Sequence, residues 1–261
     1  MTQEIICEVK DSIATVTLNR PEALNAFTEE MMAAGEKLFD GFGRDEAVRC
    51  VVLTGRGKHF SAGGDIADFK ERIENKTYLT RSYIEKCAAM ARSILSCPKP
   101  VIAMINGAAA GGGLGLALAC DFRVVTEKSR LVMAFINVAL SGDTGSIYNL
   151  QKIVGMGKVR ELLMLGEPVG GKEAVEMGLA TRLAEEGKLE ETAYALAAKL
   201  AALPPDALRR QKEILFTRFY GDLPDYTRQE VDNIVEGSRS ADFAEATYAF
   251  LEKRKAVFSG K

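Results

Sequence analysis

Apolar and polar residues alternate in two short segments near the start of the chain, residues 5–9 and 13–18. Between them lie Lys10, Asp11 and Ser12, three polar residues that suit a tight turn. Alternation with a period of two is typical of strands that bury one face. The pattern therefore predicts a β-hairpin at the start of the chain.

Helical periodicity and short apolar runs then follow one another. Thr28 is a suitable N-cap for a helix whose apolar residues recur every three or four positions, at Met31, Ala34, Leu38 and Phe42. Further helical patterns lie at residues 78–95, 112–119 and 145–153, and strand-like runs lie at 50–54, 101–105, 122–126 and 131–135. The first of these runs predicts a short strand buried on both faces. The repeated strand–strand–helix order favours an α/β fold with stacked, related turns.

After Gly166 helical patterns dominate, interrupted by glycines and by Pro204 and Pro205. We expect the last third of the chain to form a helical appendage that covers a face of the core or meets a partner chain. The composition supports a globular protein, with 47% hydrophobic and 27% charged residues among 261.

Charge and cysteine usage exclude several classes of protein. The 34 basic and 36 acidic side chains leave a formal net charge of -2, which gives no general attraction to nucleic acid or to an anionic membrane. The five cysteines are scattered, odd in number and free of CxxC spacing, so neither a disulfide framework nor a zinc site is expected. The first ten residues, MTQEIICEVK, lack the features of a signal peptide. We expect a cytoplasmic protein.

Two glycine-rich turns are the first candidates for chemistry. Residues 60–66 (FSAGGDI) follow the predicted buried strand and open a helix, and residues 111–115 (GGGLG) also enter a helix. Small residues at a helix N-terminus leave N–H groups accessible to a ligand. Two such turns facing one another could direct one N–H each at a single oxygen, which is an oxyanion hole. Tight packing of helix against strand is the alternative interpretation of either turn alone.

Neither turn matches a nucleotide-binding motif. A GxGxxG motif starting at Gly111 requires glycine at position 116, which is Leu116, and no GxxxxGK[ST] sequence occurs.

Several ordered segments resemble one family. They are residues 18–26, 57–66, 99–107, the glycines 111–113, 119–122, 174–179 and 250–254. Each is a modest signal, but their joint presence in this order resembles the crotonase superfamily, the enoyl-CoA hydratase/isomerase family, over essentially the whole chain. The resemblance implies a spiral of repeated ββα turns over residues 1–200 with a CoA-thioester site. It also implies a helical oligomerisation region over residues 201–261 that forms homotrimers or dimers of trimers. No cofactor is implied, because coenzyme A is part of the substrate, and no metal.

The resemblance also assigns roles to single residues. By motif position, the backbone N–H groups of Gly64 and Gly112 hold the thioester oxygen. Ala62 and Ile66 match positions that contact the adenine and pantetheine portions of CoA. Phe250 and Lys253 match positions that reach a neighbouring subunit's CoA, although a packed phenylalanine beside a surface lysine is the alternative. The substrate-binding set is completed by Gly63, Asp65, Gly111, Phe135 and Leu140.

The reaction depends on the acids that accompany the oxyanion hole, because a hole alone moves no proton. Similar hydratases use two glutamates; the first position here is Gly115, and the second falls in residues 135–140, which contain no glutamate. Asp143 instead matches the single acid of crotonase-type enoyl-CoA isomerases, including the ring-opening type of aromatic degradation. Burial against Phe135, Val138 and Leu140 would raise its pKa and make it a stronger base. The alternative role of Asp143 is to cap the following helix.

We therefore expect an enoyl-CoA isomerase with Asp143 as proton shuttle, acting on a fatty or an aromatic-pathway acyl group. Enoyl-CoA hydration is one alternative. Another is an aryl-CoA dehalogenase or thioesterase-like hydrolase with Asp143 as nucleophile. Such dehalogenases pair the aspartate with a tryptophan and a histidine, whereas this chain has no tryptophan and its single histidine, His59, lies in a turn. A non-catalytic CoA-ester or RNA-binding homologue is the last alternative.

Overall fold

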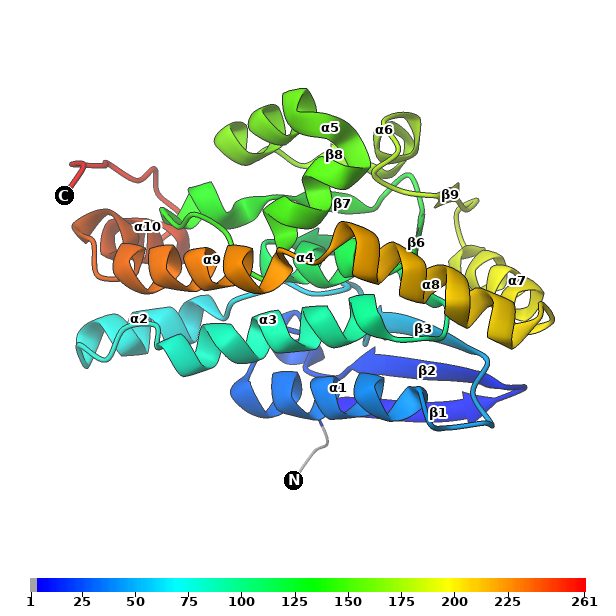
Figure 1. Ribbon diagram of the computed structural model, residues 1–261. Helices are drawn as coiled ribbons and strands as arrows, with labels where there is room; N and C mark the ends of the chain where they lie inside the picture. Colours follow the sequence, from blue (N-terminus) through cyan, green and yellow to red (C-terminus); the bar gives the residue numbers. More distant parts are fainter. Residues whose placement is uncertain (1–3) are drawn as a thin grey trace.

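The computed structural model describes residues 4–261, and Figure 1 shows helices gathered around a central sheet. The strands are β1 (Ile5–Lys10), β2 (Ile13–Leu18), β3 (Cys50–Gly55), β4 (Val101–Met104), β5 (Ala108–Ala110), β6 (Phe122–Val125), β7 (Arg130–Val132), β8 (Val169–Gly170) and β9 (Arg182–Leu183). The α-helices are α1 (Glu29–Phe42), α2 (Ile66–Glu74), α3 (Arg81–Ser96), α4 (Gly112–Ala119), α5 (Ser146–Leu165), α6 (Gly171–Glu176), α7 (Leu189–Ala201), α8 (Pro205–Phe219), α9 (Leu223–Gly237) and α10 (Ala241–Leu251). Two 3₁₀ helices are η1 (Pro21–Ala23) and η2 (Ala134–Val138).

The larger sheet of the described chain has the strand order β1-β2-β3-β4-β6-β9. Its first two strands form the predicted antiparallel hairpin, and every later neighbour is parallel. Both turn residues, Asp11 and Ser12, have positive φ angles. A second sheet joins β5, β7 and β8. This mixture of parallel strands and intervening helices confirms the α/β class.

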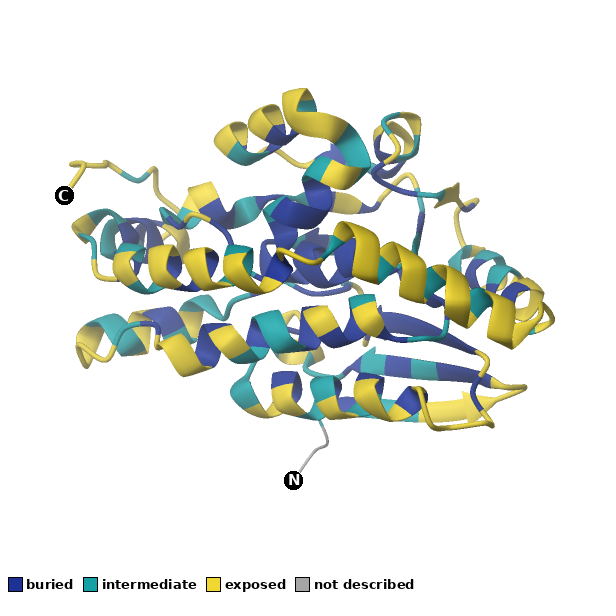
Figure 2. Ribbon diagram, viewed as in Figure 1, coloured by how far each residue is buried: buried dark blue, intermediate teal, exposed yellow. Residues whose placement is uncertain are grey.

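The predicted burial of the 50–54 run on both faces is confirmed in β3, where all six residues are buried. Val51 and Leu53 belong to the main hydrophobic core with residues of α1 and α3. Cys50 and Val52 point to the opposite face, where Ala193 and Ala197 of α7 cover them. In Figure 2 β3 is dark blue, whereas the helices beside it carry exposed residues, in yellow, on their outer turns.

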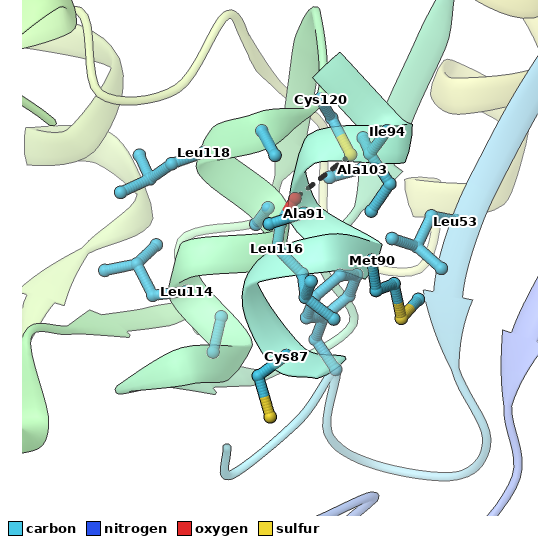
Figure 3. Packing of buried hydrophobic residues seen from close by; sticks show 14 of the residues in the cluster. Leu53, Cys87, Met90, Ala91, Ile94, Ala103, Leu114, Leu116, Leu118 and Cys120 are labelled. Carbon is cyan, nitrogen blue, oxygen red and sulfur yellow. Dashed lines mark hydrogen bonds between the residues drawn. The ribbon is translucent and has the colours of Figure 1, made fainter. Parts of the chain in front are cut away.

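Helix α4 is buried at every position from Gly112 to Ala119. Figure 3 shows Leu116 of this helix on the side of Met90 of α3, whereas Leu114 and Leu118 point away from α3. Arg123 closes the C-terminal end of the helix, since Nη1 donates to the carbonyl oxygens of Cys120 (2.7 Å) and Ala117 (3.3 Å). Such a cap satisfies carbonyl groups that a helix end leaves without partners. Helix α4 is therefore fixed at one end by Arg123, and its other end lies at the glycine turn.

Two boundaries differ from the sequence-based expectation. The run 131–135 is not one strand, because β7 ends at Val132 and Phe135 lies in η2. A short apolar run has the same appearance in a strand and a helix, and here Asn137 Nδ2 anchors the 3₁₀ turn by donating to Gly166 O at 3.0 Å. The helix expected at 145–153 extends to Leu165, with a break at Gly155, whose φ is 73°.

The last third of the chain is largely helical, as expected. Helix α8 has no buried residue and exposes Ile214, Leu215 and Phe219. Helix α10 instead packs on α2, where the rings of Phe69 and Phe243 lie 5.4 Å apart.

Candidate active site

The first glycine turn is tied to the second by backbone hydrogen bonds around Ser61. The Ser61 N–H donates to Ala108 O at 3.2 Å, and the Ala110 N–H donates to Ser61 O at 2.9 Å. The Ser61 hydroxyl donates to Asn25 O at 2.7 Å and accepts from the Gly63 N–H at 3.1 Å. These bonds fix the turn against β5, the strand that leads into the second glycine turn.

The two turns approach each other so closely that glycine is required. Gly63 has φ 78°, and a Cβ at this position would lie 2.8 Å from the Gly112 nitrogen. A Cβ at Gly113 would lie 2.4 Å from Ser61 O. Side chains at either position would push the turns apart. The predicted facing arrangement of the two glycine turns is therefore what the chain forms.

The amides of Gly64 and Gly112 are free in this arrangement. Neither N–H donates a hydrogen bond to another of the described residues. Gly112 is the first residue of α4, where N–H groups have no acceptor within the helix and the helix dipole favours negative charge. Both residues line one cavity. An oxygen that gains negative charge in this cavity has two amide donors available from two different loops.

Asp143 lines the same cavity from the loop that precedes α5. Its loop is unusual, because Gly142, Thr144 and Gly145 all have positive φ angles of 124°, 57° and 64°. The N-cap of α5 is Gly145, and no side chain caps this helix. The capping role for Asp143 is therefore wrong, since the loop turns its carboxylate away from the helix end.

The surroundings of Asp143 make its carboxylate a stronger base than an exposed one. The residue is half-buried because part of it faces the cavity, while its Oδ1 atom is inaccessible and has no hydrogen-bond partner in the described chain. Burial raises the pKa of Asp143 to about 7, against a smaller lowering by the Thr144 side chain. Near neutral pH the group can therefore accept a proton and return it.

The cavity has a volume of about 300 Å³ and walls that are mostly apolar. Of the predicted site residues, it is lined by Ala62, Gly64, Ile66, Gly111, Gly112, Phe135, Leu140, Asp143 and Phe250. Phe250 reaches it from α10 of the same chain. The proposed contact of Phe250 and Lys253 with a neighbouring subunit stays a prediction.

Three predicted residues lie outside the cavity wall. Gly63 packs against the backbone of Gly112, since a Cβ at Gly63 would lie 2.8 Å from the Gly112 nitrogen. Asp65 caps α2 by accepting from the Ala67 N–H at 3.0 Å, and its other oxygen pairs with Arg20 at 3.2 Å. Lys253 follows α10 on the exposed surface.

Helix α3 contributes a wall of the cavity whose individual residues could not be assigned from the sequence. Tyr83, Ile84 and Cys87 are buried and line the cavity. Burial raises the pKa of both the Tyr83 hydroxyl and the Cys87 thiol, so both are neutral hydrogen-bonding groups near pH 7. The helix itself was predicted from its apolar spacing, but spacing alone does not say which residues of a buried face meet a cavity.

His59 also lines the cavity, from the turn in which it was expected to lie. It is half-buried, and its Nδ1 accepts from the Ala108 N–H at 3.3 Å. The ring therefore helps to join the two glycine turns.

The position expected to carry the first hydratase glutamate is filled from another loop. A Cβ at Gly115 would lie 1.8 Å from Thr144 Oγ1, so no side chain fits there without moving the Asp143 loop. In the second position, η2 presents Ala134, Phe135 and Val138 to the cavity, and its one polar contributor, Asn137, already donates to Gly166. Asp143 is the only carboxylate among the described residues that line the cavity.

Across residues 4–261, no three His, Cys, Asp or Glu side chains are grouped to hold a metal ion. None of the described helices is long and apolar enough to cross a membrane.

Comparison with known proteins agrees with this geometry. The family model "Enoyl-CoA hydratase/isomerase" matches residues 8–261. A 1,2-epoxyphenylacetyl-CoA isomerase of Escherichia coli is 33% identical over 262 residues, covering 100% of both chains. A short-chain-enoyl-CoA hydratase of Clostridium acetobutylicum is 31% identical and covers 96% of this chain and 95% of its own. The crystal structure of an enoyl-CoA hydratase from Mycobacterium avium superimposes with a TM-score of 0.89 at 26% identity, covering 98% of this chain and 99% of that one.

Fold and paired glycine turns together define a crotonase-fold enzyme that acts on acyl-CoA esters. The chain belongs to the enoyl-CoA hydratase/isomerase family. Its relatives include both hydratases and isomerases, so membership alone does not choose between the two reactions.

Proposed function

We propose that the protein is an enoyl-CoA isomerase in which Asp143 carries a proton from one carbon of the acyl group to another. The observation that supports this most directly is that Asp143 is the one carboxylate among the described residues that line the cavity, which it shares with two free amides. Position 115, where similar hydratases carry their first glutamate, is closed by Thr144. Isomerisation needs one group that takes and returns a proton, whereas hydration in similar enzymes also activates a water molecule.

The mechanism uses groups that the chain already holds in place. The thioester oxygen accepts hydrogen bonds from the N–H groups of Gly64 and Gly112, which stabilise the enolate as negative charge moves onto that oxygen. In a 3-enoyl ester the Asp143 carboxylate removes a proton from the carbon between the thioester and the double bond, which forms the dienolate. The resulting carboxylic acid returns this proton to a different carbon, and the double bond or ring bond shifts accordingly. The apolar wall limits competing proton exchange with water.

The experiment follows proton movement directly. The wild-type protein and Asp143→Asn are incubated in D₂O with 3-enoyl, 2-enoyl and aromatic CoA esters, and products are analysed by NMR and mass spectrometry. We expect deuterium entry or double-bond migration with the wild type and a loss of about 10²- to 10⁴-fold in the variant. A CoA-ester titration of both proteins shows whether binding is retained.

Other outcomes distinguish the alternatives. Addition of water to a 2-enoyl ester identifies a hydratase, and halide release or CoA release identifies nucleophilic attack by Asp143. CoA-ester binding without turnover by the wild type identifies a binding protein. Equal turnover by wild type and Asp143→Asn contradicts the proposed role of Asp143.

The proposed substrate contains coenzyme A, and we propose no additional cofactor. We also propose that residues 201–261 take part in forming a homotrimer or a dimer of trimers. The exposed apolar side chains Ile214, Leu215 and Phe219 on α8 support a subunit contact there. Light scattering coupled to size-exclusion chromatography measures the mass, and a monomer at micromolar concentration contradicts the assembly.

A further inference from the structure

A second carboxyl group lies behind the loop that carries Asp143. Glu230 belongs to α9 and is only 6% exposed. Its Oε2 accepts a hydrogen bond from the Gly145 N–H at 2.8 Å, across 85 positions of the sequence. Sequence analysis gave no signal for this residue, and it does not line the acyl cavity.

The bond lies where the loop needs support. Thr144 is a non-glycine residue with φ 57°, a conformation that costs free energy and persists only where the surroundings hold it. Gly145 starts α5 without a side-chain cap, so its N–H finds no acceptor from its own segment. Glu230, on a helix distant in sequence, supplies the missing acceptor for Gly145, which lies two residues after Asp143.

The carboxyl group borders a small hollow of about 200 Å³ on α9. Ser141 and Gly142 of the Asp143 loop line this hollow, while Leu140 and Asp143 line the acyl cavity. Residues 140–143 thus separate the acyl cavity from the hollow. Glu230 binds the same loop at Gly145, from the side of the hollow. If this loop became mobile, water could reach the Asp143 carboxylate.

We propose that Glu230 is a positioning residue for the reaction proposed above: through the Gly145 amide it holds Asp143 in its water-excluded place. The inference rests on the proposed function for its kinetic readout, but not for its structural one. Glu230 does not touch the reacting atoms.

The charged neighbours of Glu230 are consistent with a neutral acid in this role. Burial raises the pKa of Glu230 to about 8; the Gly145 amide lowers it, the nearby Asp143 raises it and Tyr226 lowers it. Within residues 4–261 Glu230 forms no ion pair. The charged residues of α3 beside α9, Arg81, Glu85 and Arg92, line a separate groove.

The test compares two substitutions of similar volume. Glu230→Gln keeps an oxygen that accepts from the Gly145 N–H, whereas Glu230→Met fills the same space without an acceptor. Glu236→Gln, at an exposed position of the same helix, is the control. For each protein we measure kcat, the dissociation constant of a CoA ester, and the pH dependence of kcat/KM.

We expect Glu230→Gln and Glu236→Gln to stay within about threefold of wild type in kcat. Glu230→Met is expected to lose roughly 10- to 100-fold in kcat, with ester binding changed less than about threefold, because a small displacement of a catalytic group has effects of this size. In its pH profile of kcat/KM, the acidic limb should move to a pH below 7, because water that reaches Asp143 removes the burial that raises the pKa of this residue. A general loss of stability would lower activity without moving this limb.

Wild-type kcat and an unmoved limb in Glu230→Met would overturn the proposal. Equal impairment of the Gln and Met variants would also overturn it, since the acceptor would then be irrelevant. If Glu230→Met does not fold, hydrogen exchange decides: the Gly145 amide must be protected in wild type and in Glu230→Gln. If wild type turns over no thioester, the proposed function fails separately, and the carboxyl infrared band of Asp143 still reports its titration in each variant.

Discussion

Oδ1 of Asp143 faces Gly112 so directly that a Cβ at Gly112 would lie 3.3 Å from this oxygen. The proposed base and one of the two proposed oxyanion donors are thus neighbours across a gap that only a glycine leaves open. The ring of Phe27 closes the gap from another side, 2.8 Å from the same Cβ position. In the proposed mechanism, a thioester whose oxygen is held by the Gly112 amide has its adjacent carbons close to Asp143, as proton transfer requires.

The titration of Asp143 should be visible in the pH dependence of turnover. In the proposed mechanism the carboxylate form of Asp143 is the active base, and burial raises its pKa to about 7. The value of kcat/KM is therefore expected to rise from pH 5 and to level off above about pH 8. An acidic limb near pH 4 instead would show that Asp143 is solvated in the free enzyme.

The same titration should appear in stability. Asp143 has a folded-state pKa above its unfolded value of 3.8, so the folded state holds the proton more tightly. Its contribution to stability is then fully present below pH 4 and is lost as the pH rises through 7. A shift from 3.8 to about 7 corresponds to a change of about 4 kcal/mol.

Asp143→Asn isolates this contribution because Asn does not titrate. Urea unfolding of both proteins between pH 4 and pH 8 gives the difference in unfolding free energy. We expect the unfolding free energy of the variant to increase relative to that of the wild type as the pH rises, whatever the difference between them at pH 4. A difference that stays constant with pH would contradict the raised pKa.

Much of the fold could be predicted because its signals are local. The hairpin, the Thr28 cap and the buried β3 each depend on residues close together in sequence, and Thr28 does accept from the Met31 N–H at 3.0 Å. The two glycine turns were candidates because small residues open predicted helices, whereas Asp143 came from the family resemblance, which carries information on tertiary placement that composition does not. Asp143 could thus be assigned before its surroundings were known.

The remaining parts of the site depend on contacts between distant segments. Tyr83 and Cys87 line the cavity only because of how α3 rotates against α4. Thr144 fills the space beside Gly115, and Glu230 bonds to Gly145 from 85 residues away. No local pattern of apolar or polar residues specifies such contacts, since each is fixed by the packing of whole helices.

The oxyanion hole can be tested at Gly64 with a pair of substitutions. A Cβ at this position would lie 2.3 Å from Phe69 Cζ, so any side chain displaces the ring of Phe69. Gly64→Ala causes this displacement but keeps the N–H, whereas Gly64→Pro causes it and removes the N–H. We expect Gly64→Pro to have kcat/KM lower than Gly64→Ala by about 10²- to 10³-fold.

Circular dichroism and a CoA-ester titration establish that both Gly64 variants fold and bind. Equal kcat/KM values in two folded variants would remove the Gly64 amide from the mechanism.

The contact between Gly115 and Thr144 leads to the last prediction. A Cβ at Gly115 would lie 1.8 Å from Thr144 Oγ1 and 2.9 Å from Thr144 Cβ, and Thr144 is fully buried. Gly115→Ala must therefore displace Thr144, and with it the neighbouring Asp143. We expect a loss of about 1–3 kcal/mol in stability from overpacking and a roughly 10- to 100-fold lower kcat.

Two further variants separate this contact from a general effect of alanine. Gly157→Ala, also in a helix but with open space around its Cβ position, should be neutral or slightly stabilising. Thr144→Gly removes the obstructing side chain at a position whose φ of 57° suits glycine. In the Thr144→Gly background, Gly115→Ala should lower the unfolding free energy by a smaller amount. The double-mutant cycle should give a coupling free energy of about 0.5–3 kcal/mol. Additive effects of the two substitutions would mean that Thr144 does not block position 115. The argument that no hydratase-type glutamate fits at position 115 would then lose its physical basis.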